Sequence, residues 1–275
     1  MQIIHSIQAL RSWRAQHNDI AFVPTMGNLH AGHLALVAKA RQQASQVVVS
    51  IFVNPLQFGV NEDYSRYPRT MEHDIELLQS MGVDVLFAPS VEELFPAPQS
   101  YHVEPPPVAN ELCGAFRPGH FRGVATIVMK LFNIIQPTIA VFGRKDYQQL
   151  TIIRGMVADF AIPVTLLAGE TIRAEDGLAL SSRNGFLSAD ERSTAPQLYA
   201  KLVEMKGQIL AGAHDHMQIE QRAIDDLSAQ GWQVDYVAIR DTNLAIPTLD
   251  SQRLVILVAA RLGSTRLIDN IEIDS

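Results

Sequence analysis

Short apolar runs alternate with helical patterns along the first part of the chain. Runs rich in Val, Ile and Phe predict buried strands at 20–25, 47–53, 83–89 and 138–143. A helical pattern covers 33–44, and another at 71–82 places Ile75, Leu78 and Gln79 near one face. Strand, helix and strand in repeated order predict a parallel sheet with right-handed crossovers, and ligands of such sheets bind beyond the carboxyl ends of the strands.

The last hundred or so residues show a different order of elements. Ser188 and Glu191 have the spacing of a capping box, which predicts that a helix over 188–210 begins there. A second helix is expected over 217–231, followed by strands at 233–241, 253–263 and 266–273. The fold class is therefore α/β, with a Rossmann-like parallel-sheet domain over 1–175 and a smaller α+β domain over 176–275.

Composition narrows the class of protein. The 275 residues are 47% hydrophobic and 19% charged, which is typical of a globular chain. The net charge of -7 argues against a general nucleic-acid surface, and the apolar runs are too short to span a membrane. Cys113 is the single cysteine, so no intrachain disulfide or cysteine-rich zinc site is possible. We see no signal peptide near the start of the sequence and expect a cytoplasmic protein.

The stretch FVPTMGNLHAGHLALVAKA, residues 22–40, carries the sharpest chemical signal. His30 and His33 lie where a predicted strand turns into a helix, with Gly32 between them. A helix N-terminus binds anions through its unpaired N–H groups, and a glycine lets the backbone approach a ligand. The alternative is that one histidine caps the helix and the other lies on the surface. The H-x-G-H pattern at this turn favours an anion site.

Polar residues follow two other predicted strands. Asn54 and Gln57 come after the second strand, although an Asn-Pro pair can also mark a simple turn. Lys145 and Asp146 follow the strand at 138–143 and precede Gln149 at a helix start. A lysine there can bind phosphate oxygens, and the alternative is a solvated lysine.

Two further segments bring together donors and cations. RPGHFRGV places Arg117, His120 and Arg122 around two glycines, which suits an anion better than a core. GLALSSRNGF joins two hydroxyls to Arg183 and could also be a linker. The chain has neither a Walker A sequence nor G-x-G-x-x-G, so phosphates must be bound in another way.

Six motifs stand out along the chain: PTMGNLHAGH, SIFVNPLQF, YPRT, RPGHFRGV, GRKDYQQL and DGLALSSRNG. Together they resemble the pantoate–β-alanine ligase family, within the nucleotidylyltransferase superfamily that carries H-x-G-H. The motifs run in family order, and the C-terminal AARLGSTRLIDN extends the resemblance over nearly the whole chain. The resemblance implies that ATP adenylates (R)-pantoate and releases pyrophosphate. The amine of β-alanine then attacks pantoyl adenylate, which gives pantothenate and AMP. It also implies Mg²⁺ arriving with ATP, and a homodimer.

The resemblance assigns roles by position. His33 matches the proton donor, with His30 and Lys145 as further catalytic residues. Gln57 and Gln149 match the glutamines that bind pantoate, and Gln57 also lies near β-alanine. Asn54 and Arg122 are expected among the substrate contacts. The ATP contacts are expected to be Met26, Gly27, Asn28, Leu29, His30, Ala31, Gly32, His33, Gly143, Arg144, Lys145, Asp146, Ile172, Leu180, Ser181, Ser182 and Arg183.

Arg144 departs from the family pattern, which has glutamate in G-E-K-D. It therefore favours one alternative, a catalytically silent nucleotide-binding protein. Another alternative is a plain nucleotidylyltransferase, but Gln57 and Gln149 argue against it, because a phosphorylated acceptor would favour a cation there. We expect no protein metal ligand, because Mg²⁺ bound with ATP commonly keeps several waters.

Overall fold

The structure is a computed structural model that describes residues 1–60, 62–248 and 251–274. The described residues form two compact units. Unit 1 comprises Met1–Arg144 and Gln149–Glu170, and unit 2 comprises Lys145–Gln148 and the chain from Thr171 onward. Each unit has its own sheet and its own hydrophobic core.

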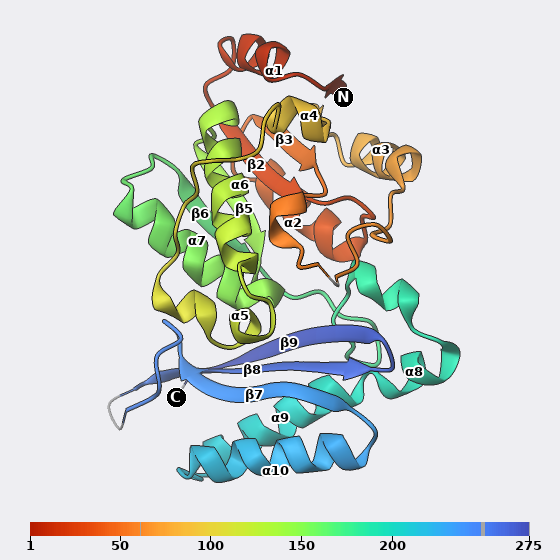
Figure 1. Cartoon of the computed structure of the whole chain (residues 1–275), viewed down its shortest axis with the longest axis vertical. Helices are drawn as coiled ribbons and strands as arrows, with labels where there is room; N and C mark the ends of the chain where they lie inside the picture. Colours follow the sequence, from red (N-terminus) through yellow and green to blue (C-terminus); the bar gives the residue numbers. More distant parts are fainter. Residues whose placement is uncertain (61, 249–250, 275) are drawn as a thin grey trace. The chain divides into compact units, whose positions relative to one another are not determined.

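Unit 1 contains a parallel sheet, as the sequence predicted (Figure 1). Among the described residues it has six strands in the order β1-β4-β3-β2-β5-β6. The strands are β1 (Gln2–Ile4), β2 (Ile20–Thr25), β3 (Gln46–Ile51), β4 (Val85–Phe87), β5 (Ile139–Gly143) and β6 (Thr165–Gly169). The pattern of apolar runs located the inner four strands and missed β1 and β6. These two lie at the sheet edges, where partial exposure removes the need for a continuous apolar run.

Helices cover both faces of this sheet. The α-helices of unit 1 are α1 (Ile7–Arg14), α2 (Ala31–Arg41), α3 (Met71–Ser80), α4 (Val91–Leu94), α5 (Cys113–Phe116), α6 (His120–Ile135) and α7 (Tyr147–Asp159), whose first residues belong to unit 2. Short 3-10 turns are η1 (Pro55–Gln57), η2 (Pro107–Asn110) and η3 (Arg144–Asp146). Buried side chains of α1, α6 and α7 pack on one face, and those of α2 and α3 pack on the other.

Helix α3 buries a different set of residues from the predicted one. Leu78 is buried and Ile75 partly so, but Gln79 is exposed. Asp74 shares the inner face with Leu78, four residues later, and has no exposed surface. The apolar pattern could not indicate this, since a buried carboxylate requires partners that lie elsewhere in the chain.

Unit 2 is an α+β unit, as expected. Within its described part, β7 (Gln233–Asp241), β8 (Arg253–Leu262) and β9 (Thr265–Asp274) form an antiparallel sheet. Helices α9 (Gln197–Leu210) and α10 (His216–Ala229) share a core with this sheet. The predicted capping box of Ser188 and Glu191 is present at α8 (Ala189–Thr194). The single helix predicted over 188–210 is wrong, because Pro196 lacks a backbone N–H and the helix is interrupted there.

The observed boundary between the units differs in detail from the predicted boundary between residues 175 and 176. Unit 1 ends at Glu170, and the short segment Lys145–Gln148 groups with unit 2. Within unit 2, Asn270 Nδ2 donates to Lys145 O at 2.8 Å, and the Tyr147 hydroxyl donates to Thr242 O at 3.3 Å. These bonds join residues far apart in the sequence, so no local composition change marks them.

Candidate active site

The turn between β2 and α2 is closed by its two histidines. His30 is the N-cap of α2, and its Nδ1 accepts from the backbone N–H of Gly32 at 3.1 Å. His33 Nδ1 accepts from the backbone N–H of His30 at 3.3 Å. The two ring centroids lie 4.1 Å apart. Both histidines therefore cap the helix, whereas the alternative inferred from the sequence had only one of them in this role.

This capping fixes the proton positions of the neutral rings. An Nδ1 that accepts a backbone hydrogen bond carries no proton, so the proton of each neutral ring lies on Nε2. Gly32 makes the arrangement possible, because a Cβ there would lie 2.8 Å from Cε1 of His30. The H-x-G-H pattern thus builds a helix N-terminus with two Nε2–H donors, a combination suited to an anionic oxygen.

Strand order brings the predicted polar segments to one edge of the sheet. Since β3, β2 and β5 are neighbours in a parallel sheet, the segments that follow them all leave from the carboxyl ends of the strands, on the same side of the sheet. Gln57 follows β3, and its Nε2 donates to the Met26 sulfur, which follows β2, at 3.3 Å. Asn54 Nδ2 donates to Gln57 Oε1 at 3.0 Å and to Gly123 O at 3.2 Å. Asn54 is buried, so it orients the Gln57 amide.

The backbone of Gln57 is held by α6 and the segment before it. His120 Nδ1 donates to Gln57 O at 2.8 Å, and Arg117 Nη1 donates to His120 Nε2 at 3.0 Å. Arg117 forms a bidentate ion pair with Glu62, with distances of 2.7 and 2.5 Å. Helix α6 also packs closely here, because a Cβ on Gly123 would lie 2.1 Å from Leu56 O.

These contacts change the expectation for RPGHFRGV. Each arginine of the segment has a carboxylate partner, since Arg122 Nε lies 3.0 Å from Glu104 Oε2. Buried His120 forms a bridge between Arg117 and Gln57. Arg117 and His120 therefore support the loop that carries Gln57, whereas the substrate contact of Arg122 stays a prediction. The sequence could not show this, because Glu62 lies 55 residues from Arg117.

The segment after β5 contains the unusual Arg144. Gly143 pairs with Gly169 of β6, and Arg144 Nη1 lies 3.2 Å from Glu170 Oε2 at the same edge. Arg144 therefore has a carboxylate partner in the residue that directly follows β6. Gln149, in the first turn of α7, is partly buried. In unit 2, Lys145 Nζ lies 3.9 Å from Asp146 Oδ2, and the Lys145 side chain is 18% exposed.

The remaining predicted nucleotide contacts form a tight loop in unit 2. Leu180 N donates to Ile172 O at 2.9 Å, which closes the base of the loop. Ser181 caps η4 (Ser182–Phe186), and its Oγ accepts from Arg183 N at 3.2 Å. Arg173 anchors the loop to β9 through two bonds to Asp269, at 2.6 and 2.9 Å. Arg173 carried no signal in the sequence, and Asp269 appeared there only within the C-terminal AARLGSTRLIDN, without a role.

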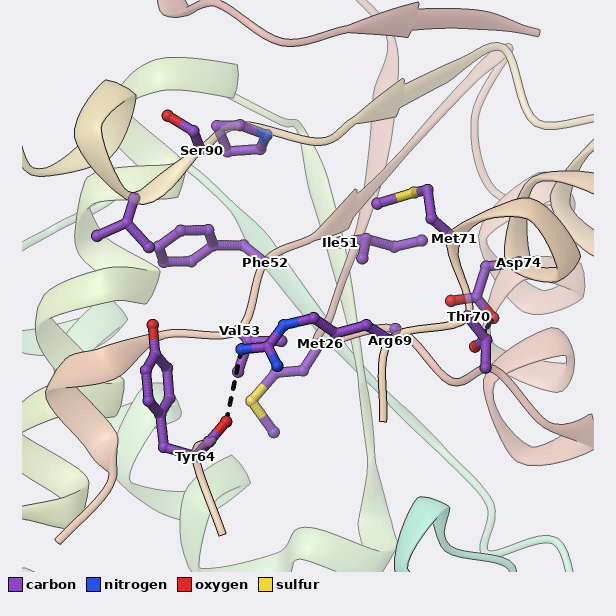
Figure 2. A pocket seen from close by; sticks show the side chains of 13 residues that line it. Met26, Ile51, Phe52, Val53, Tyr64, Arg69, Thr70, Met71, Asp74 and Ser90 are labelled. Carbon is purple, nitrogen blue, oxygen red and sulfur yellow. Dashed lines mark hydrogen bonds between the residues drawn. The ribbon is translucent and has the colours of Figure 1, made fainter. Parts of the chain in front are cut away.

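A pocket of about 290 Å³ opens beside the histidine turn (Figure 2). Its lining is mainly apolar, with Arg69, Thr70, Asp74 and Ser90 as polar side chains. The other lining residues are Met26, Gly27, Ile51, Phe52, Val53, Tyr64, Met71, Pro89 and Val91. Gln57 and Gln149 do not line it, although Met26 joins it to Gln57. Asp74 was missed in the sequence because a single acidic residue on a helix has no distinctive pattern.

Among the described residues, no group of three or more His, Cys, Asp or Glu side chains is placed to hold a metal ion. Across 1–60, 62–248 and 251–274, no helix has the length and apolar character needed to cross a bilayer.

The chain is similar to known proteins over its whole length. The family described as Pantoate-beta-alanine ligase matches residues 2–272. A pantothenate synthetase of Chromobacterium violaceum is 58% identical over 275 residues, which is 99% of each chain. The crystal structure of pantothenate synthetase from Thermus thermophilus is 45% identical, with a TM-score of 0.94 and full coverage of both chains. A pantoate–β-alanine ligase of Francisella tularensis, complexed with β-γ ATP and β-alanine, is 37% identical, with a TM-score of 0.83 and coverage of 98% of this chain and 97% of that chain.

Proposed function

Because this chain belongs to the pantoate–β-alanine ligase family and is a ligase of that kind, we propose that it consumes ATP and works through a pantoyl adenylate. The observation that carries this proposal is the β2–α2 turn, where two Nε2–H donors lie at a helix N-terminus. Such a turn suits the phosphates of a nucleotide. The relative from Francisella tularensis, whose structure contains an ATP and β-alanine, supports the same substrates here.

The proposed reaction has two steps. A carboxylate oxygen of (R)-pantoate attacks the α-phosphorus of ATP, and the bond between that phosphorus and the bridging oxygen breaks. Pyrophosphate leaves with the electron pair. The amine nitrogen of β-alanine then attacks the acyl carbon, the bond to AMP breaks, and the amine gives up a proton. The products are pantothenate and AMP.

The chain's own residues act mainly on charge and position. His33 and His30 donate Nε2–H hydrogen bonds to phosphate oxygens, and the bond from His33 stabilises the negative charge that builds up on pyrophosphate as it leaves. Lys145 stabilises the negative charge that develops during adenylation. Gln57 and Gln149 bind pantoate, whose hydroxyls and carboxylate need groups that both donate and accept. Gly143, Arg144, Asp146, Ile172 and the loop Leu180–Arg183 complete the proposed ATP contacts.

The Mg²⁺ ion is proposed to arrive with ATP. The groups around the turn are imidazoles and backbone N–H donors, which suit phosphate oxygens and not a cation. Asp74, the nearby carboxylate, already accepts three hydrogen bonds. The ion would therefore be held by phosphate oxygens and water, and it would neutralise part of the phosphate charge. The predicted cytoplasmic location and homodimer remain predictions.

Isotope exchange tests the adenylate directly. With pantoate and ATP present and β-alanine absent, labelled pyrophosphate is expected to enter ATP, because pantoyl adenylate forms reversibly. AMP should accumulate in stoichiometric amounts with pantothenate only after β-alanine is added. Exchange that requires β-alanine would contradict the intermediate. Exchange without pantoate would instead support a nucleotidylyltransferase of another kind.

The glutamines provide a test of the pantoate site. Gln57→Ala or Gln149→Ala leaves pantoate hydroxyl or carboxylate groups without a partner, which costs about 1–3 kcal/mol. The pantoate KM in the exchange assay is therefore expected to rise by about tenfold or more. ATP affinity, measured by calorimetry, should hardly change.

The matched control is Gln79→Ala, which removes an exposed glutamine of the same unit. It should leave the pantoate KM and the ATP affinity unchanged. If both site variants keep the wild-type pantoate KM, then pantoate binds elsewhere, and the apolar pocket beside Met26 becomes the next site to probe.

A further inference from the structure

A buried carboxylate of α3 holds the turn that leads to His30. Asp74 has no exposed surface and comes from the first turn of α3. Its Oδ2 accepts from Asn28 N at 2.9 Å, and its Oδ1 accepts from Leu29 N at 2.8 Å. The Thr70 hydroxyl donates to the same Oδ1 at 3.2 Å, and Figure 2 shows these two side chains meeting at the pocket.

The turn held by Asp74 has an unfavourable backbone conformation. Gly27 has a φ of 83° and Asn28 a φ of 51°, so two consecutive residues lie in the left-handed region. A non-glycine residue adopts this region at an energetic cost, which the surroundings must offset. Asp74 binds the N–H of Asn28 and that of the next residue. The carboxylate therefore stabilises the strained part of the turn.

The same turn fixes where the histidines lie. His30 follows Leu29 directly and is the N-cap of α2. His33 Nδ1 accepts from the His30 N–H, so a displaced His30 also loses its contact with His33. Asp74 is thus connected with both histidines through its hydrogen bond to Leu29 N and the Leu29–His30 backbone, and from there through the bond between His30 N and His33 Nδ1.

We propose that Asp74 is a positioning residue for catalysis: its carboxylate holds the Gly27–Leu29 turn so that His30 and His33 present their Nε2–H groups to the phosphates of ATP. This rests on the proposed function of the two histidines. Asp74 itself acts only through the backbone. An asparagine cannot replace it, because both carboxylate oxygens accept N–H bonds, and an amide would place an NH₂ group against a backbone N–H.

Asp74→Asn in the full chain tests the proposal. Small displacements of catalytic groups reduce rates by up to about 100-fold, so we expect pantoate-dependent exchange to fall by about 10- to 100-fold. The ATP KM should rise, and the pantoate KM should stay at its wild-type value. Thr70→Val removes only the hydroxyl donor and should give a smaller change of the same kind. If Asp74→Asn does not fold, the kinetics of Thr70→Val still test the proposal.

Asp84→Asn is the matched control. Asp84 also accepts a backbone N–H, from Val47 at 2.7 Å, and it pairs with Arg41 at 2.6 Å. Asp84 precedes β4, whereas the histidine turn follows β2. Asp84 therefore lies at the amino ends of the parallel strands, and the histidine turn lies at their carboxyl ends. Asp84→Asn is expected to lower the melting temperature while the ATP KM and the exchange rate per folded molecule remain at their wild-type values.

The outcomes separate the two hypotheses when His33→Ala is assayed in parallel. A selective loss of exchange and a raised ATP KM in Asp74→Asn, absent from Asp84→Asn, support the positioning role. If His33→Ala loses exchange but folded Asp74→Asn and Thr70→Val keep wild-type kinetics, Asp74 is structural only and the proposal is wrong. If His33→Ala keeps full exchange, the proposed function of the turn is wrong, and the role of Asp74 falls with it.

Discussion

Pantoate-dependent ATP–pyrophosphate exchange is expected to fall by about 10²–10³-fold in His33→Ala, the usual effect of removing one hydrogen-bond donor to a developing charge. The physical reason is the loss of an Nε2–H group at the helix N-terminus where pyrophosphate leaves. His33 Nδ1 accepts from the backbone N–H of His30, so the tautomer that donates from Nε2 is the one present in the neutral ring. ATP affinity, measured by calorimetry, should fall much less than the exchange rate, because the backbone N–H groups remain.

His73→Ala is the control for this variant. His73 belongs to the same unit, and its side chain is 65% exposed, with Nδ1 4.0 Å from Glu76 Oε2. Its removal should leave exchange at the wild-type level. Near wild-type turnover in His33→Ala would rule out this hydrogen-bond role. A parallel loss of ATP affinity and rate would instead assign His33 to ground-state binding.

Lys145→Ala is expected to slow adenylation by about 10²–10³-fold, the usual effect of removing one group that stabilises developing charge. The Lys145 side chain is mostly buried, and its Nζ lies 3.9 Å from Asp146 Oδ2. A lysine held in this way keeps its cation near a fixed position, in contrast to a solvated lysine. The measurement is the exchange rate at saturating ATP and pantoate.

Two variants serve as controls: one removes a different lysine of unit 2, and the other keeps the positive charge at position 145. Lys206→Ala removes a lysine whose Nζ donates to Glu272 O, and it should leave exchange unchanged. Lys145→Arg keeps the charge but changes its shape, so it should recover part of the lost rate. Equal exchange in Lys145→Ala and wild type would mean that the solvated-lysine alternative is correct.

Much of the fold follows from local patterns. The inner strands β2 to β5 are apolar because both faces of a parallel sheet are covered, and such runs are visible in any single segment. The H-x-G-H turn is equally local, since a strand, a glycine and a helix start lie within a few residues. The edge strands β1 and β6 were missed because their burial is incomplete.

Long-range contacts account for what the sequence did not indicate. Arg117 and His120 suggested an anion site, but the fold brings Glu62 to Arg117 and the Gln57 carbonyl to His120. A guanidinium with a carboxylate partner within 2.7 Å has a different role from one that faces a ligand. Composition gives the residue types, and only the fold gives their partners.

The sequence by itself determined the parallel sheet, the carboxyl ends of its strands as the place where the polar segments emerge, and the helix that begins at the His30–His33 turn. Hydrophobic periodicity and turn chemistry act between near neighbours, so these features can be inferred without a fold. The tertiary structure decided which buried charged side chains contact the segments at the carboxyl ends of the strands. Asp74 lies 46 residues from Asn28, and only the packing of α3 on the sheet brings its carboxylate to the turn. A buried carboxylate must find donors wherever the fold places it, because burial without them would be too costly.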